Sequence, residues 1–283
     1  MRPVTTQTLV DGLAFGEGPR WHDGSLYLSD MHSHRVLQVD MTGRVETVLV
    51  HDRPVSGLGW LPDGRLLVVD MAGFVLRVDD DAVVEHADLR ALAAHGINDM
   101  ISHPGGWSYV GQFGYDRHAG QSVVPSPLLR VDADGTVSAA ADDMRVANGM
   151  AITPDGSTLL VAESAGGRIT SFPIGDKGDL GPRSTFAELD TAPDGMCIDA
   201  EGAAWVGCVV GGRFARVLPG GEETDSVPMP EGRNAVACVL GGPDRRTLFM
   251  LTASTFGEDD RSRAAMDARV ETIEVAVPGA GRP

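Results

Sequence analysis

The sequence GPRWHDGSLYLSDMHSHRVLQVD, residues 18–40, decides the fold because its pattern recurs along the chain. Residues 57–79, GLGWLPDGRLLVVDMAGFVLRVD, have the same order: an apolar run, an Asp-Gly pair, a second apolar run, a polar break and a strand-like segment ending in Val-Asp. Four further copies occupy residues 98–114 with 127–137, 148–172, 194–217, and 237–254 with 269–277. A pattern that returns at a regular interval indicates a repeat architecture.

The period of this repeat is that of a β-propeller. The first turns of the copies are 40 to 50 residues apart and fall at Asp23, Asp63, Gly105, Asp155, Glu201 and Asp244. Each unit holds three or four short β-type runs, and an Asp-Gly pair between two such runs predicts a tight hairpin. Helical repeats have similar periods, but these units are rich in Gly, Val and Thr and lack a 3.6-residue periodicity. We therefore predict an all-β, six-bladed β-propeller with four antiparallel strands per blade.

A ring of blades has to close, because its last sheet otherwise leaves an open edge. The short β-patterned run at residues 5–10 precedes the first copy, and we predict that it adds the outer strand to the last blade beside residues 269–277. No linker interrupts the series, so residues 1–283 are expected to form one domain. The helix-like stretch DLRALAAH, residues 88–95, is expected to be a short connector.

Composition and charge exclude several classes of function. The 283 residues include 36 Gly and 17 Pro, as many tight turns require, and 40 acidic against 23 basic residues give a formal net charge of −17. Such a chain repels phosphate backbones and anionic membrane surfaces. It has no membrane-length apolar run, no signal-peptide pattern at its start, and three cysteines without metal-site spacing. We expect a reduced, cytoplasmic protein that binds neither nucleic acid nor membranes; its oligomeric state stays open.

Polar residues occupy the same place in four copies, just before the first strand. They are Glu17, Asn98, Asn148 and Asp194; copy two has Ser56 there, and copy six has Asn234. In a propeller the innermost strands line a central channel, so their starts converge at one mouth. Carboxylate and amide oxygens are the ligands that hard cations such as Ca²⁺, Mg²⁺ or Mn²⁺ prefer, and Zn²⁺ can also bind such a set. Asn-Gly and Asp-Gly pairs can instead be simple turns, but Asn148 and Asp194 lie away from the hairpins.

The chain resembles the SMP-30/gluconolactonase/LRE family from about Phe15 to the last blade. The resemblance is carried by FGEGPRW (15–21), IND (97–99), NGMAITPDGSTLLVAES (148–164), PDGMCIDAEGAAWVG (193–207) and GGPDRRTLFMLTA (241–253). It implies one divalent metal ion, calcium first, held by Glu17, Asn148 and Asp194, with Asn98 near metal and substrate. The activity that it implies is the hydrolysis of lactones or, in relatives, of phosphotriesters.

The implied chemistry suits these residues. A cation polarises the lactone carbonyl and stabilises the oxyanion that develops when water attacks. Asp194 is then expected to be both a ligand and the general base for that water. In phosphotriesterase relatives the corresponding Asp can attack directly as a nucleophile, so both roles stay open.

One departure from the family concerns the substrate. Many sugar lactonases have an Arg two residues before the Asn of the third blade, and this chain has Gly96 there. We therefore expect a small lactone or ester that is less sugar-like, in contact with Asn98, Phe113, Tyr115, His32 and His34. The two histidines can alternatively be loop residues between strands of the first blade.

Two readings outside metal-dependent hydrolysis also stay open. One is a non-hydrolytic relative such as the strictosidine-synthase-like propellers, which lack this metal role. The other is a propeller that binds proteins or ligands without catalysis. The presence of Glu17, Asn148 and Asp194 in one phase of the repeat favours the hydrolase.

Overall fold

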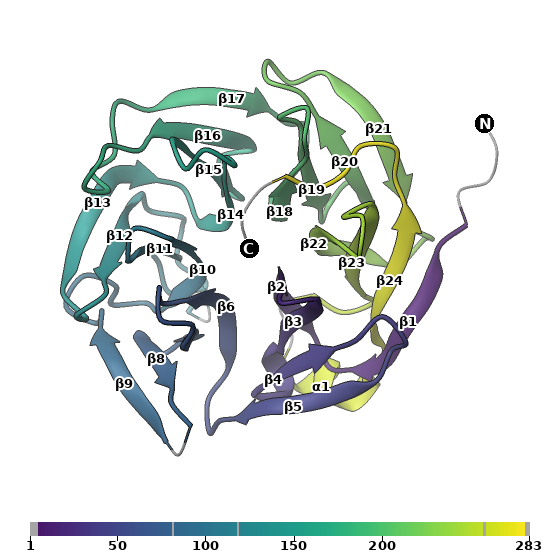
Figure 1. The fold of residues 1–283 in the computed structure, drawn as a ribbon, viewed down its shortest axis with the longest axis horizontal. Coiled ribbons are helices and arrows are strands. Elements are labelled where there is room, and N and C mark those ends of the chain that lie inside the picture. Colours follow the sequence, from purple (N-terminus) through teal and green to yellow (C-terminus); the bar gives the residue numbers. More distant parts are fainter. Residues whose placement is uncertain (1–4, 81, 118, 257–258, 281–283) are drawn as a thin grey trace.

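The computed structural model describes residues 5–80, 82–117, 119–256 and 259–280. It contains six four-stranded antiparallel sheets arranged around a central axis, as Figure 1 shows. The six-bladed propeller predicted from the repeat is confirmed. The helices of the described residues are a 3₁₀ turn, η1 (Met31–Ser33), and one short α-helix, α1 (Asp259–Ala265).

The first three blades run outward from the axis as β2–β5, β6–β9 and β10–β13. Their strands are β2 (Gly16–His22), β3 (Ser25–Asp30), β4 (Arg35–Val39), β5 (Val45–Val50), β6 (Val55–Trp60), β7 (Leu66–Asp70), β8 (Phe74–Val78), β9 (Val83–Asp88), β10 (Ile97–His103), β11 (Trp107–Gln112), β12 (Ser126–Asp132) and β13 (Val137–Met144). The next two blades are β14 (Ala147–Ile152), β15 (Thr158–Glu163), β16 (Arg168–Pro173) and β17 (Ser184–Glu188), then β18 (Pro193–Ile198), β19 (Ala204–Cys208), β20 (Arg213–Val217) and β21 (Glu223–Pro228).

The sixth blade joins the two ends of the described chain. It consists of β22 (Asn234–Gly241), β23 (Thr247–Ala253), β24 (Ala268–Glu274) and, as its outer strand, β1 (Gln7–Leu13). β1 pairs antiparallel with β24, from Gln7 opposite Thr272 to Leu13 opposite Ala268. The predicted ring closure is thus confirmed, with a strand that starts two residues later than the predicted run and is longer.

The hydrophobic core is divided among the blade interfaces. Six clusters of buried side chains occur, and each combines residues of two neighbouring blades. In one of them, Leu26 and Leu28 of the first blade pack with Phe249 and Leu251 of the sixth. Since burial of apolar surface is the main stabilising term of folding, each blade depends on both of its neighbours.

Two local predictions need correction. Asp88 ends β9, and residues 89–95 form turns rather than a helix, with Leu89 O accepting from the backbone N of Leu92 and of Ala93, each at 2.9 Å. Among the Asp-Gly hairpins, positive φ occurs at both residues only for Asp23 (47°) and Gly24 (79°), within the described chain. At the Asp63 and Asp155 turns only the glycine is left-handed, so these are longer loops than the type I′ turn.

Each inner strand has the same irregularity near its start. The pairing register shifts after the first or second residue of β2, β6, β10, β14, β18 and β22. In four blades a glycine follows the second residue, because neighbouring inner strands come very close there. A Cβ on Gly149 would lie 2.4 Å from Asp194 O, and one on Gly195 would lie 2.2 Å from Ala237 Cβ. These bulges set the direction of the side chains at the channel mouth.

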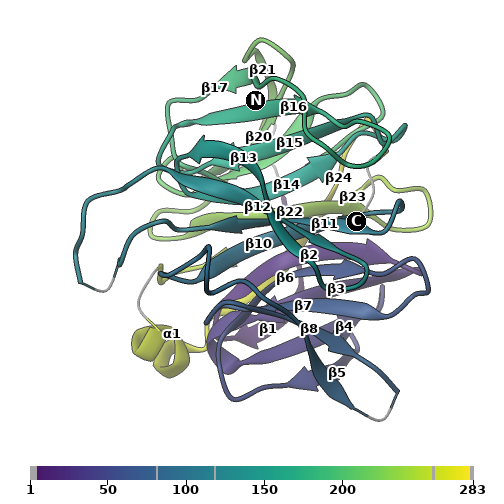
Figure 2. The same ribbon diagram turned by 90° about the vertical axis from the view of Figure 1, so that its left-hand side faces the viewer.

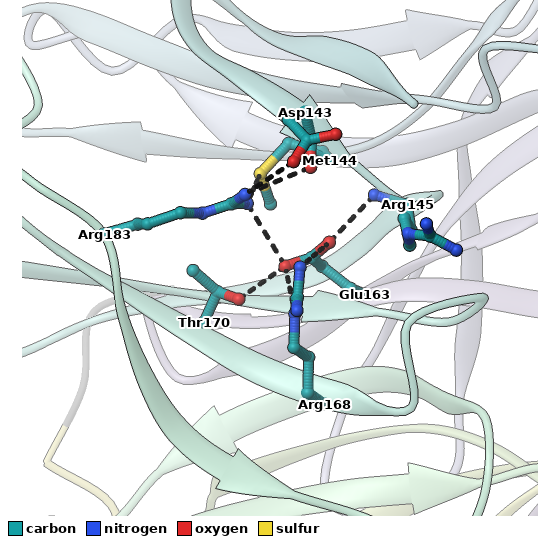
Figure 3. A network of polar contacts seen from close by, with 7 residues as sticks. All are labelled: Asp143, Met144, Arg145, Glu163, Arg168, Thr170 and Arg183. Carbon is teal, nitrogen blue, oxygen red and sulfur yellow. Dashed lines mark hydrogen bonds and ion pairs between the residues drawn. The ribbon is translucent and has the colours of Figure 1, made fainter. Parts of the chain in front are cut away.

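Several buried carboxylates join segments within a single blade. Asp30, Asp70 and Glu163 end the second strands of three blades and are fully buried. Figure 3 shows Glu163 accepting hydrogen bonds from Arg168, Thr170 and the main chain of Arg145. Burial raises the pKa of Glu163, but these hydrogen bonds outweigh it and leave the pKa below its ordinary value. These groups are structural ion pairs.

Among the described residues, none of the helices has the length and apolarity that a membrane span needs.

Candidate active site

The four predicted polar residues occupy equivalent places on four inner strands. Glu17, Asn98, Asn148 and Asp194 are the second residues of β2, β10, β14 and β18, and each is at most 9% exposed. Asn234 was predicted at the equivalent place in the sixth blade, but it is the first residue of β22, and Ala235 holds the second place. Asn234 donates to Ala253 O at 3.1 Å instead.

Glu17, Asn148 and Asp194 lie close enough for charges and hydrogen bonds to shift the pKa values of the two carboxyl groups. Burial raises the pKa of Glu17 well above its ordinary value, and the charges of Asp194 and Asp99 raise it further. The pKa of Asp194 is raised to about 8, first by burial and then by Asp99, while hydrogen bonds from Asn148 and the Gly195 backbone oppose the rise. β18 also contacts β2 although β22 lies between them in the ring. The structure thus brings Glu17, Asn148 and Asp194 together from three blades.

Two polar atoms of the four predicted residues have no hydrogen-bond partner within the described chain. Among the described residues, Asp194 Oδ1 and Asn98 Nδ2 are buried and form no hydrogen bond. A buried carboxylate oxygen without a donor is costly, in contrast to the Arg-paired oxygens of Asp30 and Glu163. A hard divalent cation would satisfy this oxygen, so the donor set fits a metal ion.

The composition of such a site is also constrained. No group of three or more His, Cys, Asp or Glu side chains in the described part of the chain could hold a metal. A cation at the channel mouth would therefore be held by the two carboxylates together with an amide oxygen. Asn148 is prepared for this, since its Nδ2 donates to Ser164 Oγ at 3.1 Å and Ser164 Oγ donates to Pro193 O at 2.7 Å. Ser164 thus orients the amide through its Nδ2, and the Oδ1 of Asn148 could serve as the amide-oxygen ligand of such a cation.

A third carboxylate, which sequence reasoning missed, lies in the channel with a basic partner. Arg20 Nη2 is 2.9 Å from Asp99 Oδ1, and Arg20 Nε donates to Leu58 O at 3.2 Å. Burial raises the pKa of Asp99, and Arg20 opposes this rise. Both residues lie inside the motifs FGEGPRW and IND. Nothing in the spacing of these motifs indicates that the two charges pair, because they belong to different blades.

Two segments from distant blades surround the mouth. Antiparallel pairing places Gln112 opposite Ile97 and Ala253 opposite Asn234, so the chain that follows β11 and β23 emerges beside the starts of the inner strands. Figure 2 shows α1 and the loop after β11 projecting from the same side of the ring. The segments that follow β11 and β23 therefore form a wall beside the candidate site, and the starts of the inner strands form its base.

Two open pockets lie along this wall. One, of about 400 Å³, contains Asn148 and is lined by Phe113, Tyr115, Arg117, Val146 and Phe256 among others. Phe113 and Tyr115 thus lie where substrate contact was predicted. The second, of about 390 Å³, is lined by Gly96 and by Phe113 and Arg117, which also line the first. Gly96 has φ +87°, and a Cβ there would lie 2.5 Å from Met71 O, so this backbone excludes an Arg at that position.

His32 and His34, which the sequence predicts to contact the substrate, lie outside the two cavities. They lie on η1 and at its end rather than on one strand face, and His34 has a left-handed φ of 56°. His32 is buried, stacks on Phe15 at 4.9 Å and places Nε2 3.1 Å from Asp259 Oδ1 of α1. Burial lowers the pKa of His32, and Asp259 opposes this. Neither histidine is among the described residues that line the two cavities, and His32 instead anchors α1.

The order of these motifs matches a known family. The sequence profile described as SMP-30/Gluconolactonase/LRE-like region matches residues 15–254. The chain belongs to this family. Two relatives are the pentonolactonase XacC of Haloferax volcanii, 28% identical over 99% of this chain and 97% of its own, and the 6-deoxy-6-sulfogluconolactonase of Pseudomonas putida, 27% identical over 95% and 94%. The chain is accordingly a lactonase-like hydrolase.

The fold of this SMP-30/gluconolactonase/LRE-like chain is shared with solved structures. A calcium-binding protein, regucalcin, from Agrobacterium tumefaciens superposes with a TM-score of 0.81 at 21% identity, over 99% of this chain and 96% of the other. In the present family member, FGEGPRW forms the start of β2, IND starts β10, and the segments at 148 and 193 start β14 and β18. Four of the five motifs of the resemblance thus cover the inner-strand starts that hold the candidate site, and the fifth, residues 241–253, lies mainly on β23.

Proposed function

We propose that this protein is a divalent-metal-dependent hydrolase that opens a lactone, or a related carboxylic ester, at the mouth of its channel. The observation that carries the proposal is the meeting of Glu17 and Asp194. Both are buried, both have a raised pKa, and neither forms an ion pair within the described residues, while Asp194 Oδ1 has no partner at all. The lactonase relatives support the substrate class.

Glu17, Asn148 and Asp194 would hold the ion. Calcium suits this all-oxygen set best, with magnesium, manganese and zinc as the alternatives. A bound cation supplies polarisation of the substrate carbonyl and stabilises negative charge on its oxygen. The regucalcin structure from A. tumefaciens is described as that of a calcium-binding protein, which supports this choice.

The chain's own residues supply the remaining roles. With Oδ1 of Asp194 directed to the ion, the carboxylate can still accept a proton from the attacking water, because each carboxylate oxygen has two lone pairs. Asn98 has a free amide N–H to donate to a substrate oxygen, and the wall of Phe113 and Tyr115 holds the substrate body and excludes water. Direct attack by Asp194 is the alternative. A single turnover in ¹⁸O-labelled water separates the two roles, because label entering the Asp194 carboxyl group indicates a covalent intermediate.

Metal content and activity test the proposal together. Protein purified without chelator is expected to contain about one divalent ion per chain and to hydrolyse lactones or aryl esters; chelation should abolish both and calcium should restore them. Asp194→Ala is expected to lose the ion, while Asp63→Ala, at an exposed turn, should keep it. Wild-type protein without metal, or an Asp194→Ala protein with unchanged metal, would overturn the site. The substrate panel should span sugar lactones, aliphatic lactones, aryl esters and phosphotriesters.

A further inference from the structure

The cavity beside Asn148 combines an apolar wall with a single charge. Phe113, Val146 and Phe256 form its apolar part, and Tyr115 and Ser164 add hydroxyl groups. Arg117 is the one charged side chain among the described residues that line it. A volume of about 400 Å³ is within the range of small-molecule sites. An apolar molecule of that size would meet a guanidinium at one side of the cavity.

The side chain of Arg117 is held against the wall of this cavity, but no carboxylate among the described residues pairs with its charge. Its guanidinium carbon lies 4.5 Å from the centre of the Phe113 ring, so a cation–π contact holds the side chain against the wall. No carboxylate of the described chain lies within 4.0 Å of its nitrogens. The planar guanidinium presents paired N–H donors that match a carboxylate. In a protein of net charge −17, such a group at the mouth offsets the repulsion that an anion would meet.

The neighbouring cavity is less suited to an anion. Arg117 also reaches it, but Asp116 and Asp259 belong to its wall. Asp259 binds His32 at 3.1 Å, and Asp116 Oδ1 accepts from the backbone N of Ala119 at 3.0 Å. These two carboxylates would repel a negatively charged ligand. The side of Arg117 that can take an anion is therefore the side shared with Asn148.

We infer that this cavity selects a lactone or ester that carries a carboxylate away from the bond to be hydrolysed. Arg117 binds that carboxylate, and Phe113 and Phe256 hold the apolar part of the molecule. Asn148 lines the same cavity, so the reacting carbonyl belongs at its end of the space. The inference rests on the proposed function, because Asn148 is one of the residues assigned to the metal ion.

A matched substrate pair tests this subsite. The pair is a five-membered lactone carrying a carboxylate and the same lactone carrying a primary carboxamide, assayed with the calcium-loaded protein. We expect wild type to prefer the carboxylate. Arg117→Gln should lower kcat/KM for the carboxylate by about tenfold to a hundredfold, mainly through KM, and that for the carboxamide by less than about threefold. Arg117→Lys should retain part of the preference, and Arg44→Gln, an exposed arginine paired with Glu46, should retain all of it.

Binding of unreactive analogues separates this inference from the proposed function. Calorimetry with cyclopentanecarboxylate and cyclopentanecarboxamide reads the subsite without catalysis, and only the carboxylate should lose affinity in Arg117→Gln. If wild type hydrolyses both lactones equally and Arg117→Gln treats them alike, the inference is overturned while lactone hydrolysis stands. If neither lactone is hydrolysed but only the carboxylate analogue depends on Arg117, the proposed function fails and the anion subsite holds. If neither analogue depends on Arg117, the subsite is absent.

Discussion

Buried carboxylates of this protein divide into two kinds by their partners. Asp70 and Glu163 accept several hydrogen bonds each, from Arg53 and from Arg168 among others, and their pKa values are lowered although burial alone would raise them. Glu17 and Asp194 are also buried, and their pKa values are raised, first by burial and then by nearby negative charge: Asp194 and Asp99 for Glu17, and Asp99 for Asp194. Burial alone therefore does not distinguish these two kinds, whereas the absence of a paired cation in the described part of the chain does, and it is the reason that Glu17 and Asp194 are the proposed site carboxylates.

Substitution of a buried carboxylate is expected to raise stability where the carboxylate has no paired cation and to lower it where an arginine is paired with it. Glu17→Gln removes like-charge repulsion, so the chelator-treated protein should melt at a higher temperature, while affinity for calcium should fall by roughly a hundredfold or more. Glu163→Gln breaks the contacts to Arg168 and Thr170 and should lower the free energy of unfolding by about 1 to 3 kcal/mol. This range already allows for solvent screening, because Arg168 is partly exposed. Thermal melts and calcium titration calorimetry measure both. A Glu17→Gln protein that is less stable without metal would contradict this.

His32 provides a pH-dependent prediction. Its pKa is lowered by burial and by the nearby Arg117 and Arg263, and raised in part by Asp259 and Asp30. A lowered folded-state pKa means that the stability from neutral His32 is present above about pH 6.5 and is lost as pH falls through the folded value. Asp259→Asn removes the main opposing charge, so NMR titration should give a still lower His32 pKa. An unchanged or higher value would show that Asp259 does not act on the ring.

At the scale of the elements, the bulges of the inner strands set the direction of the side chains at the channel mouth. Substitution of a bulge glycine tests this role. A Cβ on Gly195 would lie 2.2 Å from Ala237 Cβ, so Gly195→Ala has to push β18 away from β22. We expect a loss of about 1 to 3 kcal/mol in urea unfolding and weaker calcium binding, because Asp194 precedes this glycine. Gly175→Ala is the matched control, since its Cβ would have its nearest contact at 3.4 Å, to Asp179 O. Equal stability of the two variants would contradict the proposed role of the bulge.

Elements that follow the repeat could be predicted, and those that interrupt it could not. The common phase of Glu17, Asn98, Asn148 and Asp194 is readable because each lies six or seven residues before the first turn of its copy. The prediction for Asn234 is wrong by one residue, since β22 lacks the glycine of the bulge and Asn234 lies ten residues before the turn at Asp244 instead of six or seven.

Contacts between blades were the other part that the sequence could not predict. Arg20 and Asp99 are 79 residues apart and belong to different copies of the repeat, so periodicity carries no information about their pairing. The same holds for α1, which departs from the repeat and meets η1 from the opposite end of the chain. Such contacts depend on how the ring closes in space.

At the scale of the whole molecule, ring closure is expected to support every blade. Val10 of β1 is buried in the cluster shared by the sixth and first blades, whereas Thr8 of the same strand is exposed. Val10→Asp places a charge in that cluster and should destabilise by more than about 3 kcal/mol, while Thr8→Asp should stay within about 0.5 kcal/mol of wild type. Calorimetric melting distinguishes them. If Val10→Asp melts in two separate transitions, the blades do not unfold as one unit.

The pairing of β1 with β24 also bears on when the proposed metal site could form during biosynthesis. Gln7 pairs with Thr272, so nearly the whole chain is made before the outer strand of the sixth blade finds its partner, and such long-range closure is a late and slow step. The sixth blade lies between the strands that carry Glu17 and Asp194. A nascent or open ring holds these two carboxylates apart. Acquisition of the ion would therefore mark the completion of folding, and a calcium-sensitive probe could time it.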